Sequence, residues 1–163
     1  MDILVISDSH GRADRIETLL SVNSTHGAIF FLGDGLRDLA WIDTHNSPVY
    51  SVCGNCDLSS FCDDEILTEL AGKRIFAAHG HKYSVKSGYE RMVARAASLG
   101  ADIMLFGHTH SPLEKYFRAG ECVGETVLSK DLYVLNPGSL GYDRTFGVIT
   151  VRDGKILTSI GKI

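Results

Sequence analysis

Polar side chains of the kinds that bind metal ions stand directly after five largely apolar runs of this sequence. The five runs, each of which reads as a strand, are residues 3–7, 28–32, 49–53, 74–78 and 102–106. The residues that follow them are Asp8, His10, Asp34, Asn55, His79, His81, His108 and His110. Open α/β sheets bind ligands just beyond the carboxyl ends of their strands. We therefore expect these side chains to meet at one end of a sheet.

The chemistry of these side chains suits two divalent ions. Carboxylate, imidazole and amide oxygen, with no thiolate among them, favour Mn, Fe, Zn, Co or Ni. Without His81 there are seven such groups, more than one ion that keeps bound water would use, and they fit two ions that share a carboxylate. A single Asp or His after a strand is usually a capping or surface residue. It is the coincidence at five strand ends that indicates a site.

The remaining patterns describe the elements that must position these residues. Residues 13–22 and 87–99 have helical periodicity, and residues 36–44 form a short helical candidate. Residues 65–70 and 74–78 read as a hairpin around Gly72, and a strand-rich part begins at Lys115. Its expected strands are residues 116–118, 126–129, 132–135, 147–152 and 155–160. The sequence thus predicts a single α/β domain, residues 1–163, with two packed sheets.

Composition and charge narrow the classes of partner and compartment. The chain has 163 residues, of which 44% are hydrophobic and 22% charged, and its formal charge is −4. These values exclude a disordered chain, and a long nucleic acid or a membrane is not expected as a partner. The amino terminus lacks the features of a signal peptide, and no apolar run is long enough to span a bilayer. We therefore expect a cytoplasmic protein.

The four cysteines, Cys53, Cys56, Cys62 and Cys122, are too few for a disulfide scaffold and are expected to be reduced thiols or site residues. Cys53 and Cys56 form a C-x-x-C pair, which can mean a redox dithiol or half of a zinc site. No second such pair exists, and the residues after Asp57 read as a loop rather than as the helix that a thioredoxin-like dithiol opens. The redox interpretation is therefore the weaker one.

Five motifs in this order resemble those of the calcineurin-like metallophosphoesterase superfamily. They are Asp8-x-His10, Gly33-Asp34, Gly54-Asn55-Cys56-Asp57, His79-Gly80 and Gly107-His108-Thr109-His110. The short chain is similar to the small YfcE-like phosphodiesterase branch, over residues 1 to about 142, a range that includes Asn136-Pro137-Gly138-Ser139. The resemblance implies a four-layer α/β/β/α sandwich of two mixed sheets flanked by helices. It also implies hydrolysis of small phosphodiesters by a hydroxide that two metal ions, foremost Mn²⁺, activate.

The resemblance also implies roles for individual residues. One ion would be held by Asp8, His10, Asp34 and His110, and the other by Asp34, Asn55, His79 and His108, with Asp34 bridging. Larger family members carry His where this chain has Cys56, and that His is regarded as the leaving-group acid or a cationic clamp, oriented by the next carboxylate, here Asp57. Cys56 and Asp57 are thus the candidate catalytic residues.

Two further residues are candidates for contact with substrate, and other functions stay open. Arg12 could reach a substrate phosphate or be a solvated residue at a helix start, and His81 could support a metal ligand or face the substrate. The same sandwich serves as a non-catalytic scaffold subunit of the eukaryotic retromer complex, so the fold alone does not prove catalysis. A phosphomonoesterase is a further alternative, and a homo-oligomer is compatible with the sequence. Nucleotide-like diesters, glycerol diesters and small monoesters all fit an open site.

Overall fold

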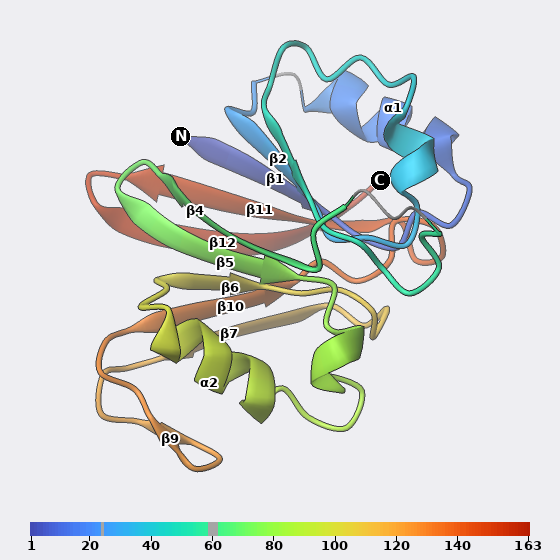
Figure 1. Cartoon of the computed structure of the whole chain (residues 1–163). Helices are drawn as coiled ribbons and strands as arrows, with labels where there is room; N and C mark the ends of the chain where they lie inside the picture. Colours follow the sequence, from blue (N-terminus) through green and yellow to red (C-terminus); the bar gives the residue numbers. More distant parts are fainter. Residues whose placement is uncertain (24, 59–61) are drawn as a thin grey trace.

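Two five-stranded mixed sheets pack against each other in the computed structural model, which describes residues 1–23, 25–58 and 62–163 (Figure 1). The first sheet has the order β12-β11-β1-β2-β3. Its strands are β1 (Asp2–Ile6), β2 (Ala28–Phe31), β3 (Val49–Ser51), β11 (Thr145–Arg152) and β12 (Lys155–Lys162). β1, β2 and β3 are parallel to one another, and β11 and β12 join as antiparallel strands.

The second sheet has the order β4-β5-β6-β10-β7. Its strands are β4 (Glu65–Leu70), β5 (Lys73–Ala78), β6 (Ile103–Leu105), β7 (Leu113–Phe117) and β10 (Leu132–Asn136). β5, β6 and β10 are parallel, whereas β4 and β7 are antiparallel edge strands. A small ribbon of β8 (Cys122–Val123) and β9 (Thr126–Val127) stands apart from both sheets.

Side chains along the central strands point alternately to the two faces of each sheet, and this places them in different layers of the core. In β1, Ile3 and Val5 face the core between the two sheets, while Leu4 and Ile6 face the opposite way. Because both faces of these strands are covered, they read as continuous apolar runs rather than as alternating ones. The α-helix α1 (Ala13–Val22) covers the outer face of the first sheet through Ile16 and its neighbours.

The α-helix α2 (Glu90–Ser98) covers the outer face of the second sheet with Met92, Val93 and Ala96 (Figure 1). The result is the expected four-layer α/β/β/α sandwich of two mixed sheets. Two short 3₁₀ helices, η1 (Leu36–Leu39) and η2 (His81–Tyr83), follow β2 and β5. No helix in the described ranges is both long and apolar enough to cross a membrane.

Most expected elements are present, with differences at their ends. The helix expected from residue 87 begins at Glu90, because Gly88 adopts a φ of 148° that a right-handed helix cannot include. The helical candidate at residues 36–44 is only the single turn η1. The strand Cys122–Val123 was not predicted; at two residues it is too short to show a periodic pattern.

Candidate metal centre

The two sheets bring Asp8, His10 and His110 together, from the loops after β1 and β6. Oδ1 of Asp8 lies 3.1 Å from Nε2 of His110 and 3.7 Å from Nε2 of His10, and the two imidazole nitrogens are 3.2 Å apart. Asp8 is fully buried, yet no described residue donates a hydrogen bond to its Oδ1. A buried carboxylate oxygen without a partner is costly unless a cation completes it. This first ligand group therefore has the chemistry of a metal site.

The other oxygen of Asp8 is held by the protein. Its Oδ2 accepts hydrogen bonds from the backbone N–H of His108, at 3.1 Å, and from the hydroxyl of Ser7. These contacts fix the carboxylate so that Oδ1 faces the two imidazoles. Hydrogen bonds of this kind orient a metal-binding carboxylate before the ion binds.

A second ligand group, Asp34, His79 and His108, has all its candidate ligand atoms within 4.8 Å of one another. Nε2 of His79 lies 3.5 Å from Oδ2 of Asp34 and 3.3 Å from Oδ1 of Asn55. Nδ1 of His79 is 2.6 Å from the backbone oxygen of Leu32. Because a carbonyl oxygen can only accept, Nδ1 carries a proton, and Nε2 is the nitrogen that faces Asp34 and Asn55.

Asp34 adjoins both ligand groups. It lies with His79 and His108 in the second group, and also within 4.8 Å of His10 and Cys56 in a further cluster. Its Oδ1 accepts a 2.7 Å hydrogen bond from the backbone N–H of Cys56. The position expected of a bridging carboxylate is thus occupied by a buried aspartate.

The charges of the second group are coupled. Burial by itself would raise the pKa of Asp34, but its hydrogen bonds with His79 and with the Cys56 backbone outweigh burial and hold that pKa well below its usual value. Burial likewise opposes charge on His79, but Asp34 and Asp8 raise the His79 pKa. Burial and the neighbouring His79 lower the pKa of His108 to about 4. His108 is therefore neutral near pH 7, the form that binds metal.

Left-handed backbone is concentrated at the candidate ligands. Of the eleven non-glycine residues with positive φ in the described ranges, five are candidate ligands: Asp8 (55°), His10 (47°), Asp34 (56°), His108 (66°) and His110 (59°). This region costs residues with a Cβ roughly 1–2 kcal/mol each, and such strain gathers at functional sites. The strand ends thus turn sharply enough to aim each side chain into the same space.

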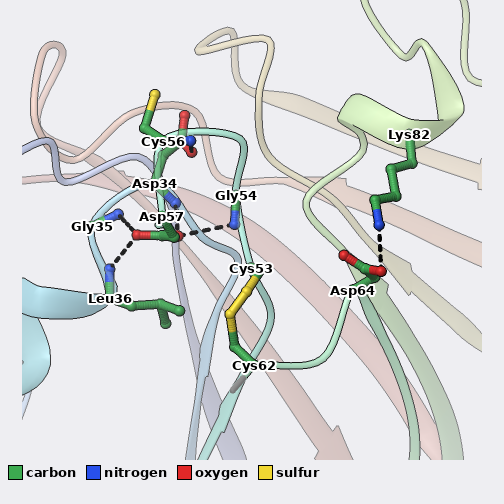
Figure 2. The surroundings of a disulfide bond; sticks show 10 residues. All are labelled: Asp34, Gly35, Leu36, Cys53, Gly54, Cys56, Asp57, Cys62, Asp64 and Lys82. Carbon is green, nitrogen blue, oxygen red and sulfur yellow. Dashed lines mark hydrogen bonds and ion pairs between the residues drawn. A yellow bond between two sulfur atoms is a disulfide. The ribbon is translucent and has the colours of Figure 1, made fainter. Parts of the chain in front are cut away.

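Asp57 binds the backbone of two site loops (Figure 2). Its carboxylate accepts hydrogen bonds of 2.7–2.9 Å from the backbone N–H groups of Asp34, Gly35, Leu36 and Gly54. The two loops touch so closely that a Cβ on Gly54 would lie 2.0 Å from Oδ1 of Asp34. Asp57 therefore fixes the position of Asp34 through its main chain.

The expectation of four reduced thiols or site residues is wrong for two of them. Cys53 and Cys62 form a disulfide, with their Cα atoms 5.6 Å apart (Figure 2). The chain returns beside itself here, since the backbone N–H of Cys53 donates to the oxygen of Asp63 at 2.8 Å. The two cysteines are nine positions apart, and that spacing by itself does not reveal the return. The C-x-x-C pair is therefore not a dithiol: Cys56 and Cys122 are free and exposed.

Cys56 points out of the loop that the disulfide closes. Its Sγ lies 3.3 Å from the amide nitrogen of Asn55. Partial desolvation, followed by the hydrogen bond with Asp34 and the charges of Asp34, Asp57 and Asp8, raises the pKa of its thiol. The thiol is therefore neutral near pH 7.

The two substrate candidates differ in placement. The guanidinium of Arg12 forms an ion pair with Asp14 at 2.7 Å and borders a separate cavity beside Arg144 and Ile163. His81 stays with the site, because its ring centroid lies 5.4 Å from that of His79, and its buried Nδ1 has no hydrogen-bond partner in the described ranges. Burial and then His79 lower the His81 pKa.

Several residues around the site carried no functional signal in the sequence. A cleft of about 250 Å³ beside His10, Asp34 and Cys56 is also lined by Leu36, Arg37 and Leu58 from η1 and the loop after β3. The hydroxyl of Ser139 donates to the backbone oxygen of Asp8 at 2.8 Å, and Asn136 donates to Gly107 at 2.9 Å. Unlike the three cleft residues, residues 136–139 belong to the motifs that carry the resemblance, and they support the ligand loops from outside the site.

The sequence match and the shared architecture establish the family. A domain of the calcineurin-like phosphoesterase superfamily matches residues 1–154, so the chain belongs to this superfamily. The probable metallophosphoesterase YsnB of Bacillus subtilis (strain 168) is 31% identical over 145 residues, which are 88% of this chain and 78% of that protein. The resemblance of the motifs to this superfamily and to its small YfcE-like branch is thereby confirmed.

Three solved structures share the fold. A predicted phosphoesterase from Streptococcus pneumoniae TIGR4 superposes with a TM-score of 0.76 at 24% identity, over 98% of this chain and 87% of that one. Vps29 of Entamoeba histolytica complexed with Zn²⁺ gives 0.71 at 22% identity, over 99% and 98%. An archaeal phosphodiesterase gives 0.69 at 22% identity, over 98% and 99%. At these identities the likeness is one of architecture.

Proposed function

We propose that this chain is a phosphodiesterase that hydrolyses small phosphodiesters with two divalent metal ions, foremost Mn²⁺. The observation that carries the proposal is the pair of ligand groups joined by Asp34, one of which contains the unpartnered Oδ1 of Asp8. The donors are carboxylate, imidazole and amide oxygen, the set that suits borderline divalent ions. The residues therefore fit the metal content that the superfamily implies.

We assign the ligands as the motifs suggest. One ion would be held by Asp8, His10, Asp34 and His110, and the other by Asp34, Asn55, His79 and His108. When bound, the two ions supply positive charge to the phosphate oxygens and a deprotonated water as nucleophile. The two carboxylates of the set offset only part of the charge of two dications. The site therefore remains attractive to a phosphate anion.

The chain's own residues position this centre. Asp57 holds the backbone of Asp34, and the Leu32 carbonyl fixes the protonated nitrogen of His79. We therefore propose that Asp57 is a positioning residue rather than a proton donor. The thiol of Cys56 lies within 4.8 Å of candidate ligand atoms of Asp34 and His10, and a neutral thiol is a weak acid that offers a leaving group its proton poorly.

A phosphodiester fits the site better than a monoester because of charge. A diester carries one negative charge near pH 7, and a monoester carries close to two. The cation that the sequence analysis suggested for the extra charge, Arg12, is instead paired with Asp14, which leaves Arg37 as the one cationic side chain among the described residues that line the cleft. The fold shared with an archaeal phosphodiesterase agrees with this choice.

The test is a matrix of ions and substrates. Metal-free protein is loaded with Mn²⁺, Fe²⁺, Co²⁺, Ni²⁺ or Zn²⁺, and hydrolysis of bis(4-nitrophenyl) phosphate and of 4-nitrophenyl phosphate is measured with the bound metal per chain. We expect two ions per chain and the fastest hydrolysis of the diester with Mn²⁺. His108→Ala removes a proposed ligand, and His45→Ala removes an exposed histidine that pairs with Asp43. Activity that survives exhaustive chelation, or that is equal in both variants, contradicts the proposal.

The alternative is a protein-interaction scaffold of the same fold. Vps29 from Entamoeba histolytica has this architecture, so the fold is compatible with a role outside catalysis. The same matrix distinguishes the two functions. Metal binding without hydrolysis of any mono- or diester would favour the scaffold, and faster hydrolysis of the monoester would favour a phosphomonoesterase.

A further inference from the structure

Tyr142 lies at the edge of the first ligand group, and no motif drew attention to it. Its ring centroid is 5.1 Å from that of His10 and 5.2 Å from that of His110. The residue is nevertheless 62% exposed, and in the described part of the chain its hydroxyl has no hydrogen-bond partner. An aromatic ring beside two candidate metal ligands thus presents open surface to solvent.

The turn that carries Tyr142 is fixed to the end of β1. The backbone N–H groups of Leu140 and Gly141 donate to the oxygens of Ser7 and Asp8 at 3.0 and 2.9 Å. The hydroxyl of Ser139 donates to the Asp8 oxygen and accepts a 3.0 Å hydrogen bond from the N–H of Tyr142. The strand end that presents Asp8 therefore also positions the backbone of Tyr142.

Two further features hold this turn in place. The side chain of Arg15, from α1, donates to the backbone oxygens of Leu140, Gly141 and Tyr142 at 3.1, 2.6 and 3.3 Å. The turn also approaches β1 so closely that a Cβ at Gly141 would lie 2.3 Å from the oxygen of Ser9. With its backbone fixed, Tyr142 can contact a ligand without first paying the entropy of ordering a loop.

The placement of this ring matters more than its exposure. Single exposed apolar side chains are common on protein surfaces. Trp41 is exposed as well, but within the described ranges its ring has no contact with the ring of a candidate ligand. A tyrosine that is fixed, exposed and next to the reacting centre is suited to contact whatever is attached to the phosphate.

We infer that Tyr142 is the residue that selects for a planar ring, such as a nucleobase, on one ester arm of the substrate, an inference that rests on the proposed phosphodiesterase function. The exposed face of a tyrosine stacks on any base, because every base has a π face. A nucleobase is uncharged near pH 7, so this contact needs no cation beyond those that hold the phosphate. Among the substrate classes that fit an open site, nucleotide-like diesters are thereby favoured over glycerol diesters.

A purely structural role for Tyr142 makes different predictions. If the ring only held the imidazoles of His10 and His110 in place, its loss would lower kcat for every substrate and weaken metal binding. If it stacks on a base, its loss raises KM more for a diester that carries a base than for one that does not, and leaves kcat and metal content unchanged. Methyl 4-nitrophenyl phosphate and the 4-nitrophenyl ester of thymidine 5′-phosphate share a leaving group and separate these cases.

The decisive experiment measures binding of two ligands that differ only in the base. The Mn²⁺-loaded protein is titrated calorimetrically with adenosine 5′-monophosphate and with ribose 5-phosphate. We expect the wild type to bind the nucleotide about fivefold more tightly or better. Tyr142→Ala should bring the ratio of the two affinities close to one, and Tyr142→Phe should keep it. Tyr116→Ala, which removes a tyrosine of 45% exposure on β7, is the matched control and should also keep it.

Failure of this inference and failure of the proposed function are distinguishable. Equal affinity for the two ligands in the wild type, or an unchanged ratio in Tyr142→Ala, overturns the role of Tyr142 even where diesters are hydrolysed. A base preference that Tyr142→Ala abolishes supports that role even where no phosphoester is hydrolysed, in which case it is the proposed function that fails.

Discussion

Asp34 is the carboxylate on which the candidate centre depends most, because it adjoins histidines of both ligand groups. Asn55, in contrast, contributes one neutral oxygen beside His79. Replacing Asp34 by Asn keeps the shape of the side chain and removes a charge that both ions would use. Water can take the place of a neutral oxygen ligand more easily. We therefore expect substitution of Asp34 to lower metal binding and activity more than substitution of Asn55.

We expect Asp34→Asn to lower diesterase activity at least about 100-fold. Loss of a residue that only supports a metal ligand usually costs about 10- to 100-fold, and Asp34 would be a ligand itself. Asn55→Ala should cost about tenfold. Bound metal, measured by elemental analysis, should fall more in Asp34→Asn. Small and equal losses in both variants would argue against a shared carboxylate.

Cys56 stands where larger relatives have a histidine, and its chemistry sets a limit on the reaction. An alkoxide leaving group needs a proton or a cation as its bond to phosphorus breaks, whereas nitrophenolate does not. A thiol with a raised pKa supplies that proton poorly. We expect nitrophenyl diesters to react well and dialkyl diesters to lag far behind.

Cys56→His tests this limit, because a protonated imidazole, unlike a neutral thiol, gives up its proton readily near pH 7. We expect this variant to raise the rate with alkyl diesters by about 10²-fold, the usual scale of acid catalysis, and to change the nitrophenyl rate little. Cys56→Ala should resemble the wild type with both. If Cys56→Ala abolishes both reactions while metal occupancy persists, the thiol has a direct role.

At the scale of elements, the loop between β3 and β4 carries Asn55, Cys56 and Asp57, and the disulfide closes it. The two cysteines are nine positions apart. A cross-link over so short a loop stabilises the fold by about 2–3 kcal/mol through the unfolded state. The disulfide therefore stabilises the segment that presents three site residues.

We expect Cys62→Ser to lower Tm by about 5–10 °C, following the usual relation between stability and Tm for a chain of this size. A reducing agent should lower the wild-type Tm by a similar amount and leave the variant unaffected. Cys122→Ser removes an exposed free thiol and is the control. An identical Tm in the reduced and oxidised wild type would mean that the cross-link does not stabilise this loop.

Asp102 joins three segments of the second sheet. It accepts hydrogen bonds from the N–H of Arg74, at 2.8 Å, and from Nζ of Lys130, at 2.6 Å. Burial favours its protonated form, but Lys130 and the Arg74 N–H prevail and lower its pKa. The pKa of Asp102 is therefore lower in the folded chain than in the unfolded chain. The stability that the ionised carboxylate contributes is present above about pH 4 and is lost as the pH falls through the folded pKa.

Asp102→Asn should reduce the free energy of unfolding by about 1 kcal/mol at pH 7, since the ion pair is partly exposed. Urea denaturation at several pH values should show this difference shrinking as the pH falls below about 4. Glu125→Gln, at an exposed carboxylate, should have no such effect. A difference that is constant over this pH range would assign the effect to packing rather than to charge.

At the scale of the whole molecule, the candidate ligands come from loops of both sheets, so bound ions would tie the sheets together. Ions that bind only the folded state raise its stability by about 2.7 kcal/mol at a concentration of 100 Kd. We expect Mn²⁺ to raise Tm by roughly 5–10 °C and a chelator to reverse the rise. His108→Ala should reduce the rise, and His45→Ala should not. An unchanged Tm would contradict binding at the junction of the sheets.

The sequence by itself determined the types of the elements and the identity of the candidate ligands. Residues 13–22 read as a helix, and α1 has those bounds, because the spacing of Ile16 and Leu19 reports a covered helix face directly. The runs before Asp8 and Asp34 read as buried strands because they lack polar alternation. Such signals are local, and each is visible within about ten residues.

Only the tertiary structure decided which of these residues meet. Asp8 and His110 are about a hundred residues apart and belong to different sheets, so the 3.1 Å between their atoms depends on how the sheets pack. The same holds for Tyr142, since the backbone of Ser7 and Asp8 fixes its turn beside His10. Arg12 shows that a neighbour in sequence can also decide a role. Its guanidinium, a candidate for contact with the substrate phosphate, forms an ion pair with Asp14 instead. Contacts between distant segments follow from strand order and sheet packing, which no local pattern of residue types encodes.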